Sequence, residues 1–188
     1  MNKLILGLLI SLFAASCKVI TETPGFYVGY ERLSEKEIEQ VVFVNPQETI
    51  TDRENDQKIY AINGKQLREF ISKSDTSVVY IWAPKCHSSV CISLLSCQKY
   101  CSDNNYDLVV VAEYYDMEMM ELQNHSKSPI FIANHQYYNK RYCPKLTKLF
   151  LKELLGPDFG DQKKEMGRFL FFYKGEFVKR KQDFFKAS

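Results

Sequence analysis

Two cysteines, Cys86 and Cys91, are the residues of this 188-residue chain whose type and spacing first suggest chemistry. Cys86 follows the continuous apolar run Ser77–Trp82, which is typical of a buried strand, and precedes a segment that we expect to be helical. A thiolate attacks a disulfide, and both a helix N-terminus and a cationic neighbour stabilise that anion. With Lys85 before it, Cys86 is predicted to be the reactive thiol; the alternative is a small buried hydrophobe.

The five-residue spacing of these cysteines restricts how they can pair. In a regular helix, residues five apart have Cα atoms on the order of 8–9 Å apart, whereas a disulfide needs Cα atoms within about 7 Å. We expect Ser88 or Ser89 to cap the helix. A disulfide between Cys86 and Cys91 therefore closes only if Cys86 lies before the helix, or if the first helical turn unwinds.

The other cysteines of the domain are predicted to be less reactive. Cys97 and Cys101 recur with Leu94 on one stripe of a helix, so we expect them to pack in the core. Cys143 precedes a proline at an expected helix start, and is either a third thiol or a cap-region residue. Because residues 86–143 hold five cysteines, an odd number, at least one thiol stays free or pairs outside the chain.

The N-terminus resembles a bacterial lipoprotein signal peptide. Lys3 gives a short positive start, Leu4–Ala15 is an apolar run too short to span a bilayer, and small residues precede Cys17. Residues 1–16 are thus the expected signal peptide, and a lipid on Cys17 would anchor the protein to a membrane of the cell envelope. The alternative is an ordinary secretory signal, since Ala14 replaces the usual leucine. Either signal exports the protein to a compartment in which disulfides can persist.

The charge balance bears on partners. Without Lys3 the chain has 24 of its 25 basic residues against 23 acidic ones, and it has no long run of lysine or arginine. A net charge near zero provides no strong field for nucleic acid, so no nucleic-acid partner is predicted. We divide the mature chain into a lipid anchor, tether and N-terminal extension at 17–45 and one domain at 46–188.

Alternating apolar runs and helical periodicities predict the elements of that domain. We expect strands at 40–44, 58–62, 77–82, 107–115, 130–133, 168–173 and 176–180. We expect helices beginning near 35 and near 88 or 89, and others at 65–73, 117–123 and 143–155. This alternation predicts an α/β fold, with a central mixed β-sheet flanked by helices. The central strand would deliver Cys86 to the start of the next helix.

The string Val78–Cys86, with Trp82-Ala83-Pro84 ahead of the cysteine, resembles the buried strand and W-A-x-x-C motif of the thioredoxin superfamily. It is most similar to the membrane-anchored, TlpA-like thiol–disulfide oxidoreductases, over about residues 58–181. The resemblance implies a thioredoxin-like fold in which Cys86 attacks disulfides and Trp82 and Pro84 shape the site.

The same resemblance implies the reaction partners. Cys91 would act as the resolving thiol, and no organic cofactor is needed. Electrons would come from a partner thiol reductant, and the substrates would be exported proteins with cysteines. The protein would thus reduce or exchange disulfides in the envelope.

Three positions depart from the family pattern. Ser89 stands where the second cysteine of C-x-x-C belongs, and Lys85 replaces an aromatic residue often found before the first. Gly167 occupies the place, just before the terminal hairpin, where the family has a cis-proline. Pro129 precedes a different strand. Ala83 stands where peroxiredoxins carry a threonine, which counts against peroxidase activity.

Two alternative functions remain open. The SCO copper chaperones are also membrane-anchored thioredoxin folds, and Cys86, Cys91 and His135 offer the sulfur and imidazole ligands that suit copper. The cysteines of that family are four apart rather than five. The departures at Ser89 and Gly167 also allow a redox-inactive thioredoxin-like domain that serves protein contacts.

Overall fold

The computed structural model describes residues 25–51, 55–86, 88, 91–123, 128–160 and 167–183, without the side chains of 122 and 123. The expected signal peptide and the lipid site Cys17 lie outside these ranges. Within them, no helix is both long enough and apolar enough to cross a bilayer.

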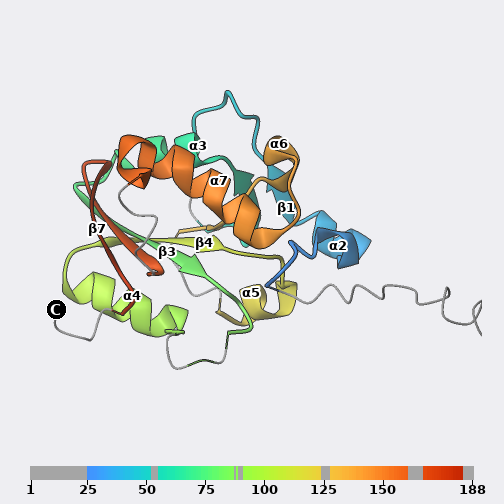
Figure 1. Cartoon of the computed structure of the whole chain (residues 1–188). Coiled ribbons are helices and arrows are strands. Elements are labelled where there is room, and N and C mark those ends of the chain that lie inside the picture. The colour runs from blue at the N-terminus through green and yellow to red at the C-terminus, as the bar shows by residue number, and fades with distance from the viewer. Residues whose placement is uncertain are drawn as a thin grey trace, which may run out of the picture.

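The described strands form one mixed sheet of seven strands (Figure 1). Their spatial order is β1 (Val41–Phe43), β2 (Ile59–Ile62), β5 (Ile130–Ala133), β4 (Asp107–Ala112), β3 (Thr76–Trp82), β6 (Phe169–Tyr173) and β7 (Glu176–Lys181). The first five are parallel, β6 is antiparallel to β3, and β7 is antiparallel to β6. The predicted α/β fold with a central mixed sheet is confirmed, and it is compatible with a thioredoxin-like fold.

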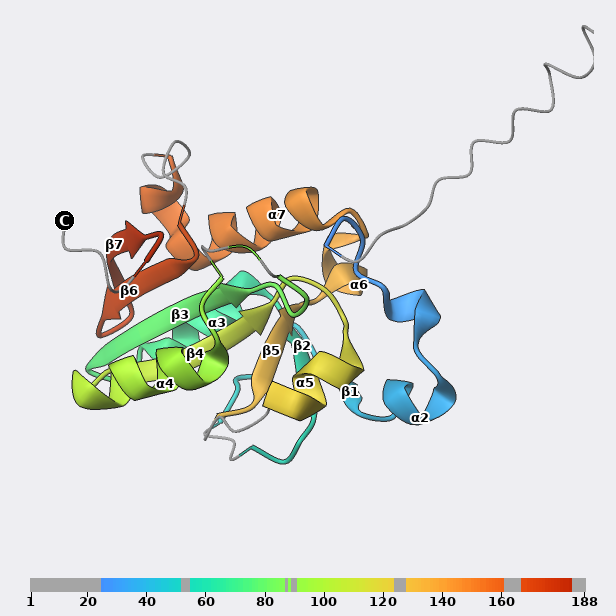
Figure 2. The same ribbon diagram turned by 90° about the horizontal axis from the view of Figure 1, so that it is seen from below.

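Helices cover both faces of this sheet. Figure 2 shows α4 (Leu94–Asp103) and α5 (Met117–Gln123) on one face, while α3 (Gly64–Ile71) and α7 (Cys143–Leu155) lie on the other. Shorter elements are α2 (Glu35–Ile38), α6 (His135–Tyr138) and the 3-10 turns η1 (Tyr30–Arg32) and η2 (Gly156–Phe159). Because both faces are covered, six consecutive residues of β3 are buried, as its apolar run predicts.

The core fixes the end of β3 in place. The ring of Tyr80 stacks on that of Phe169 with centroids 4.4 Å apart, which ties β3 to β6. Cys97 and Cys101 of α4 are 0% and 1% exposed, so their predicted core role is confirmed. Each fully buried large apolar side chain contributes roughly 1.5–3 kcal/mol. The loop that follows Trp82 therefore starts from a rigid position.

α3 begins at Gly64, one residue before the expected start at residue 65. Asn63 is the N-cap: its side chain accepts a hydrogen bond from the Gln66 N–H at 2.8 Å, and the Gln66 side chain accepts one from the Asn63 N–H. This reciprocal capping box stabilises the helix one residue earlier than expected. A Cβ at Gly64 would collide with the Phe150 carbonyl, so glycine permits the close packing of α3 on α7.

The start of α4 is the main correction to the predicted fold. The helix begins at Leu94 with Ser93 as its N-cap, and not near Ser88 or Ser89. The Ser93 side chain accepts a hydrogen bond from the Ser96 N–H at 3.2 Å, which satisfies a free donor of the first turn. The cap was expected at Ser88 or Ser89, and Ser93 was not considered. An eleven-residue loop, 83–93, therefore separates β3 from α4.

The segment before β1 is part of the folded unit. Val28 is fully buried; its N–H donates to the Arg141 carbonyl at 3.0 Å, and its carbonyl accepts from the Tyr115 N–H at 2.8 Å. β1, which lies within the expected extension 17–45, pairs in parallel with β2. The sheet thus begins before residue 46.

Candidate redox site

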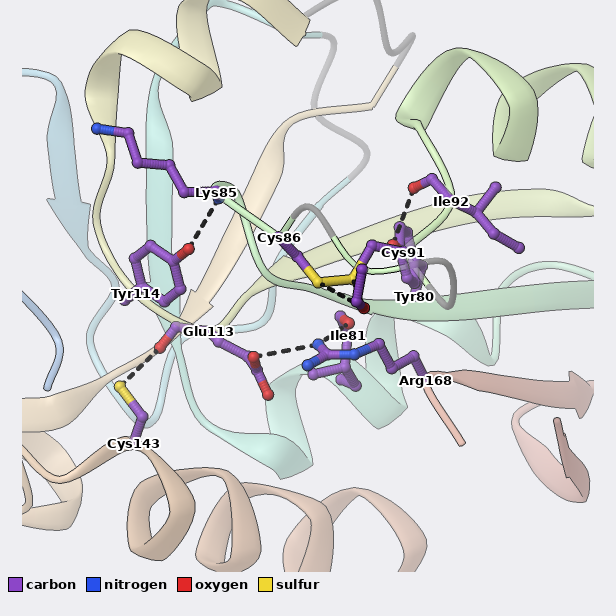
Figure 3. Close-up of polar contacts among 11 residues, drawn as sticks. Tyr80, Ile81, Lys85, Cys86, Cys91, Ile92, Glu113, Tyr114, Cys143 and Arg168 are labelled. Carbon is purple, nitrogen blue, oxygen red and sulfur yellow. Dashed lines mark hydrogen bonds and ion pairs between the residues drawn. A yellow bond between two sulfur atoms is a disulfide. The ribbon is translucent and has the colours of Figure 1, made fainter. Parts of the chain in front are cut away.

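The loop after β3 holds the two cysteines that the sequence singled out. Cys86 and Cys91 form a disulfide with Cα atoms 5.9 Å apart, and both residues are half-buried (Figure 3). Two turns shape this loop, because the Cys86 N–H donates to the Ala83 carbonyl and the Cys91 N–H donates to the Ser88 carbonyl. Since Cys86 lies well before α4, the pair closes without unwinding a helix. The predicted position of Cys86 at a helix N-terminus is wrong.

The Ser88 side chain lies beside the disulfide and is close to both of its sulfur atoms. Its hydroxyl oxygen is 3.4 Å from the Sγ of Cys86 and 3.3 Å from the Sγ of Cys91. A hydroxyl at these distances can donate to either sulfur, and such a bond is stronger when the acceptor is a thiolate. Ser88 is therefore placed to supply the donor that the helix terminus was expected to supply. From its place in the sequence, Ser88 was expected only to cap a helix.

The charge of Lys85 is not directed at the disulfide. Its Nζ lies 3.0 Å from Oδ2 of Asp116, whose side chain is 7% exposed, and its backbone N–H donates to the Tyr114 hydroxyl at 2.8 Å. Figure 3 shows the side chain extending away from the sulfur atoms. The hydrogen bond to Asp116 raises the pKa of Lys85. The expectation that this lysine stabilises the Cys86 thiolate is therefore corrected.

A different cation lies at the end of β3. Nη1 of Arg168 is 3.1 Å from Oε2 of Glu113 and donates a hydrogen bond to the Ile81 carbonyl at 2.9 Å. The Ile81 N–H donates in turn to the Arg168 carbonyl. In Figure 3 the Arg168–Glu113 pair lies just below the disulfide loop.

Tyr80 links this charged pair to the loop. Its hydroxyl donates to the Ile92 carbonyl, next to Cys91, at 2.9 Å. Burial raises the pKa of Tyr80 above its ordinary value, the positive charge of Arg168 acts to lower it, and the negative charge of Glu113 acts to raise it. The two charges of the pair therefore act on Tyr80 in opposite directions. Arg168 was missed because only the pairing of β6 with β3 brings it to the end of β3.

Trp82, Pro84 and Gly167 lie at or next to the end of β3. Trp82 is 3% exposed, Pro84 is buried, and the Trp82 carbonyl accepts from the Glu113 N–H at 2.8 Å. Continuing the β3–β6 register by two residues places Gly167 opposite Trp82. A Cβ at Gly167 would lie 2.6 Å from the Lys181 carbonyl oxygen, so this position accepts only glycine without a shift.

Pro129 and Gly167 occupy different places in the sheet. The described residues contain no cis peptide bond. Pro129 is buried before β5, which β4 separates from β3. Gly167 and Arg168, rather than Pro129, therefore lie beside the end of β3.

The remaining cysteines have little access to solvent. Cys143, the first residue of α7, is 2% exposed, and its thiol donates to the Glu113 carbonyl at 3.2 Å. Burial raises the pKa of Cys143, and likewise that of Cys101, to about 12. Burial also raises the pKa of Cys97. Of the five cysteines in the described ranges, only Cys86 and Cys91 have a half-exposed position.

His135 lies in an aromatic cluster rather than in a metal site. It begins α6 at 7% exposure, with ring centroids 5.1 Å from Tyr30 and 5.5 Å from Phe43. Burial lowers its pKa, and its Nδ1 has no hydrogen-bond partner among the described residues. These ranges contain no group of three or more histidine, cysteine, aspartate or glutamate side chains placed to hold a metal ion. Cys86, Cys91 and His135 are not brought together here.

Two cavities border the site. One of about 520 Å³ is lined by Glu113, Cys143 and Arg180, and also by Gly25. A second, of about 240 Å³, lies on the Lys85 side and includes Asp116 and Tyr27. Another cavity, of about 780 Å³, lies elsewhere, between α3, α7 and the β6–β7 turn. The cavities lined by Glu113 and by Lys85 thus both include residues of the N-terminal segment.

No family model, curated protein or solved structure matches the chain. Fold and site nevertheless define a class: an α/β protein with a mixed sheet and a close, half-exposed cysteine pair after its central strand. That combination is loosely compatible with the thioredoxin-like resemblance.

Proposed function

We propose that this protein is a thiol–disulfide oxidoreductase of the cell envelope, anchored to a membrane by a lipid on Cys17. The observation that carries the proposal is the Cys86–Cys91 pair, half-exposed on a loop that a buried strand holds in place. The other described cysteines are buried. The pair is thus accessible to another disulfide while its surroundings are fixed.

The reaction is a two-step exchange. The Cys86 thiolate attacks one sulfur of a substrate disulfide, so that a Cys86–substrate bond forms and one substrate thiolate leaves. The Cys91 thiolate then attacks the Sγ of Cys86, which forms the intramolecular disulfide and releases the second substrate thiolate. Two electrons pass to the substrate, and the protons of the two protein thiols end on the substrate thiols. A partner dithiol reduces the Cys86–Cys91 bond by the same exchange.

The surroundings of the pair favour its reduced, anionic form without a helix terminus. Ser88 is within donor distance of both sulfurs, and Arg168, paired with Glu113, lies at the end of the strand that leads into the loop. A hydrogen bond and a nearby cation both favour the charged form of an acid. No organic cofactor is needed for this chemistry. The proposed substrates are exported proteins with cysteines, and the reductant is a partner thiol protein.

The experiment that tests the activity uses the purified full chain. Exchange is followed with a fluorescent disulfide peptide and a dithiol reductant, for the wild type, Cys86→Ser, Cys91→Ser and the core control Cys101→Ala. We expect Cys86→Ser to abolish turnover, Cys91→Ser to trap the mixed disulfide, and Cys101→Ala to retain the wild-type rate. Wild-type turnover no faster than that of Cys86→Ser would refute the proposal. Tight Cu(I) binding lost in Cys86→Ser would then favour the copper-binding alternative.

The anchor is tested separately. Cys17→Ser should leave the protein soluble or unprocessed, whereas the wild type should fractionate with membranes. A correctly cleaved Cys17→Ser variant that stays in the membrane fraction would show that the anchor does not depend on this residue.

A further inference from the structure

The N-terminal segment docks at the end of the sheet where β3 leads into the disulfide loop, residues 83–93. We call this end of the domain the redox edge. The Phe26 carbonyl accepts from the Cys143 N–H at 2.8 Å, and Tyr27 forms an isolated antiparallel bridge with Tyr142. Buried Val28 continues this contact. Figures 1 and 2 both place the start of the described chain beside the loop that follows β3. The tether therefore leaves the domain at one defined point.

A short chain of contacts joins that point to the disulfide. A Cβ built on Gly25 would lie 3.6 Å from Cε1 of Tyr114, and the Tyr114 hydroxyl accepts from the N–H of Lys85, the residue before Cys86. Each of the two cavities described above also joins a residue of the N-terminal segment to a residue near the disulfide loop. Gly25 shares the larger one with Glu113, and Tyr27 shares the smaller one with Lys85. The exit of the tether and the redox loop thus occupy the same edge.

The tether is short. From Cys17 to Gly25 there are eight Cα-to-Cα steps, which reach at most about 28 Å when fully extended. Two aromatic side chains are also exposed at its exit, with Phe26 at 55% and Tyr142 at 37%. Aromatic residues with an apolar body favour the boundary between bilayer and water.

We propose that the redox edge of the domain faces the bilayer, and that its partners are membrane proteins whose cysteines lie close to the membrane surface. This inference rests on the proposed function and on the lipid anchor at Cys17. The opposite edge carries the β6–β7 turn, where the Lys174 N–H donates to the Asp75 carbonyl. The seven residues of β3 separate the two edges by roughly 20 Å, at about 3.3 Å per residue.

The orientation is tested with the full-length lipidated protein in phosphatidylcholine vesicles that carry a surface acceptor dye. A donor is placed on Cys86 in Cys91→Ser, or on Lys174→Cys in the variant that also carries Cys86→Ser and Cys91→Ser. We expect stronger energy transfer from position 86 than from position 174. Equal transfer, or stronger transfer from position 174, would overturn the orientation. Failure of the wild-type protein to carry lipid on Cys17 would overturn it too.

Two exposed aromatic residues provide a matched pair. Phe26 and Tyr173 are 55% and 54% exposed, and they lie at opposite edges of the domain. Phe26→Ser should lower energy transfer from the dye on Cys86, whereas Tyr173→Ser should leave it unchanged. Because the Phe26 bond to α7 uses the backbone carbonyl, this substitution preserves the docking of the segment. An equal effect of both substitutions would refute a role for Phe26 at the bilayer.

The partner class is tested by exchange. One disulfide peptide is presented on a transmembrane anchor either directly above the bilayer or at the end of a long spacer, and also free in solution. We expect at least tenfold faster exchange with the near peptide than with the spaced one. Inserting a 20-residue Gly-Ser spacer between Ile20 and Thr21 should remove this preference, whereas the same spacer after Ser188 should not. Equal rates would refute this inference alone, while no exchange with any peptide would refute the proposed function.

Discussion

Nη1 of Arg168 lies 3.1 Å from Oε2 of Glu113 and also donates to the Ile81 carbonyl, at the point where β3 delivers the chain to the cysteine loop. Both side chains are about three-quarters buried. The charges of a largely buried ion pair are held in place, and each of them interacts more strongly with neighbouring groups than an exposed charge does. Like Lys85, Arg168 is paired with a carboxylate, but it is more deeply buried and is held at the end of β3. We predict that it acts on the Cys86 thiolate.

Replacing Arg168 should therefore slow the redox chemistry. In reduced protein with Cys91→Ser, we expect Arg168→Met to lower the alkylation rate of Cys86 at pH 7 by about three- to tenfold, because the thiolate loses a nearby cation. Arg168→Lys should recover part of the rate. The rates are measured with iodoacetamide between pH 5 and 10. An unchanged rate in Arg168→Met would mean that the guanidinium does not influence the Cys86 thiolate.

Ser88 should contribute independently. We expect Ser88→Ala to slow alkylation of Cys86 in the same background by about fivefold, which corresponds to loss of about 1 kcal/mol of hydrogen bonding to the thiolate. Ser102→Ala, an exposed serine change on α4, serves as the control. Alkylation is again measured against pH. If Ser88→Ala and Ser102→Ala react alike, the hydroxyl contacts seen in the disulfide form do not persist after reduction.

The elements with the clearest patterns were predictable from sequence. The bounds expected for α5, β5 and α7 match the structure, because continuous apolar runs and helical periodicity define them without competing signals. The Ser34–Glu37 capping box also marked α2 correctly. These are local features. They require no knowledge of which strands become neighbours.

The site was less predictable, because it depends on pairing across the sheet. Lys85 precedes Cys86 in sequence, yet its charge pairs with Asp116 after β4. Arg168, more than 80 residues away, reaches the loop because β6 pairs with β3. His135 was expected in a loop but is buried, since residues Tyr30 and Phe43 from the N-terminal segment pack on it. Spacing alone carried no signal for these contacts.

The buried thiol of Cys143 should make stability depend on alkaline pH. Burial raises its pKa from 9.0 to about 12, so the folded state keeps the proton while the unfolded state loses it above pH 9. The stabilisation is fully present below pH 9 and is lost as the pH rises towards 12. We expect the free energy of unfolding of the wild type to fall more between pH 8 and 10.5 than that of Cys143→Ala. Urea titrations followed by Trp82 fluorescence measure this difference, and parallel curves would contradict the prediction.

Gly167 provides a test of how the backbone next to the end of β3 packs against β7. Its Cβ position lies 2.6 Å from the Lys181 carbonyl oxygen, and its own carbonyl accepts from Nε of Arg180. Gly167→Ala must push β7 away from the start of β6, so we expect it to destabilise the fold by about 1–3 kcal/mol. Gly160→Ala is the matched control, because the nearest atom to its Cβ lies at 3.9 Å. Denaturant titration measures both variants.

The same substitution should also affect the chemistry, because Arg168 follows Gly167 directly. Displacing the backbone here moves the guanidinium relative to Glu113, so alkylation of Cys86 should slow in Gly167→Ala and not in Gly160→Ala. The rate is measured well below the denaturation midpoint, so that loss of folded protein does not contribute. A destabilised Gly167→Ala variant with the full alkylation rate would show that the packing of β7 and the reactivity of the cysteine pair are independent.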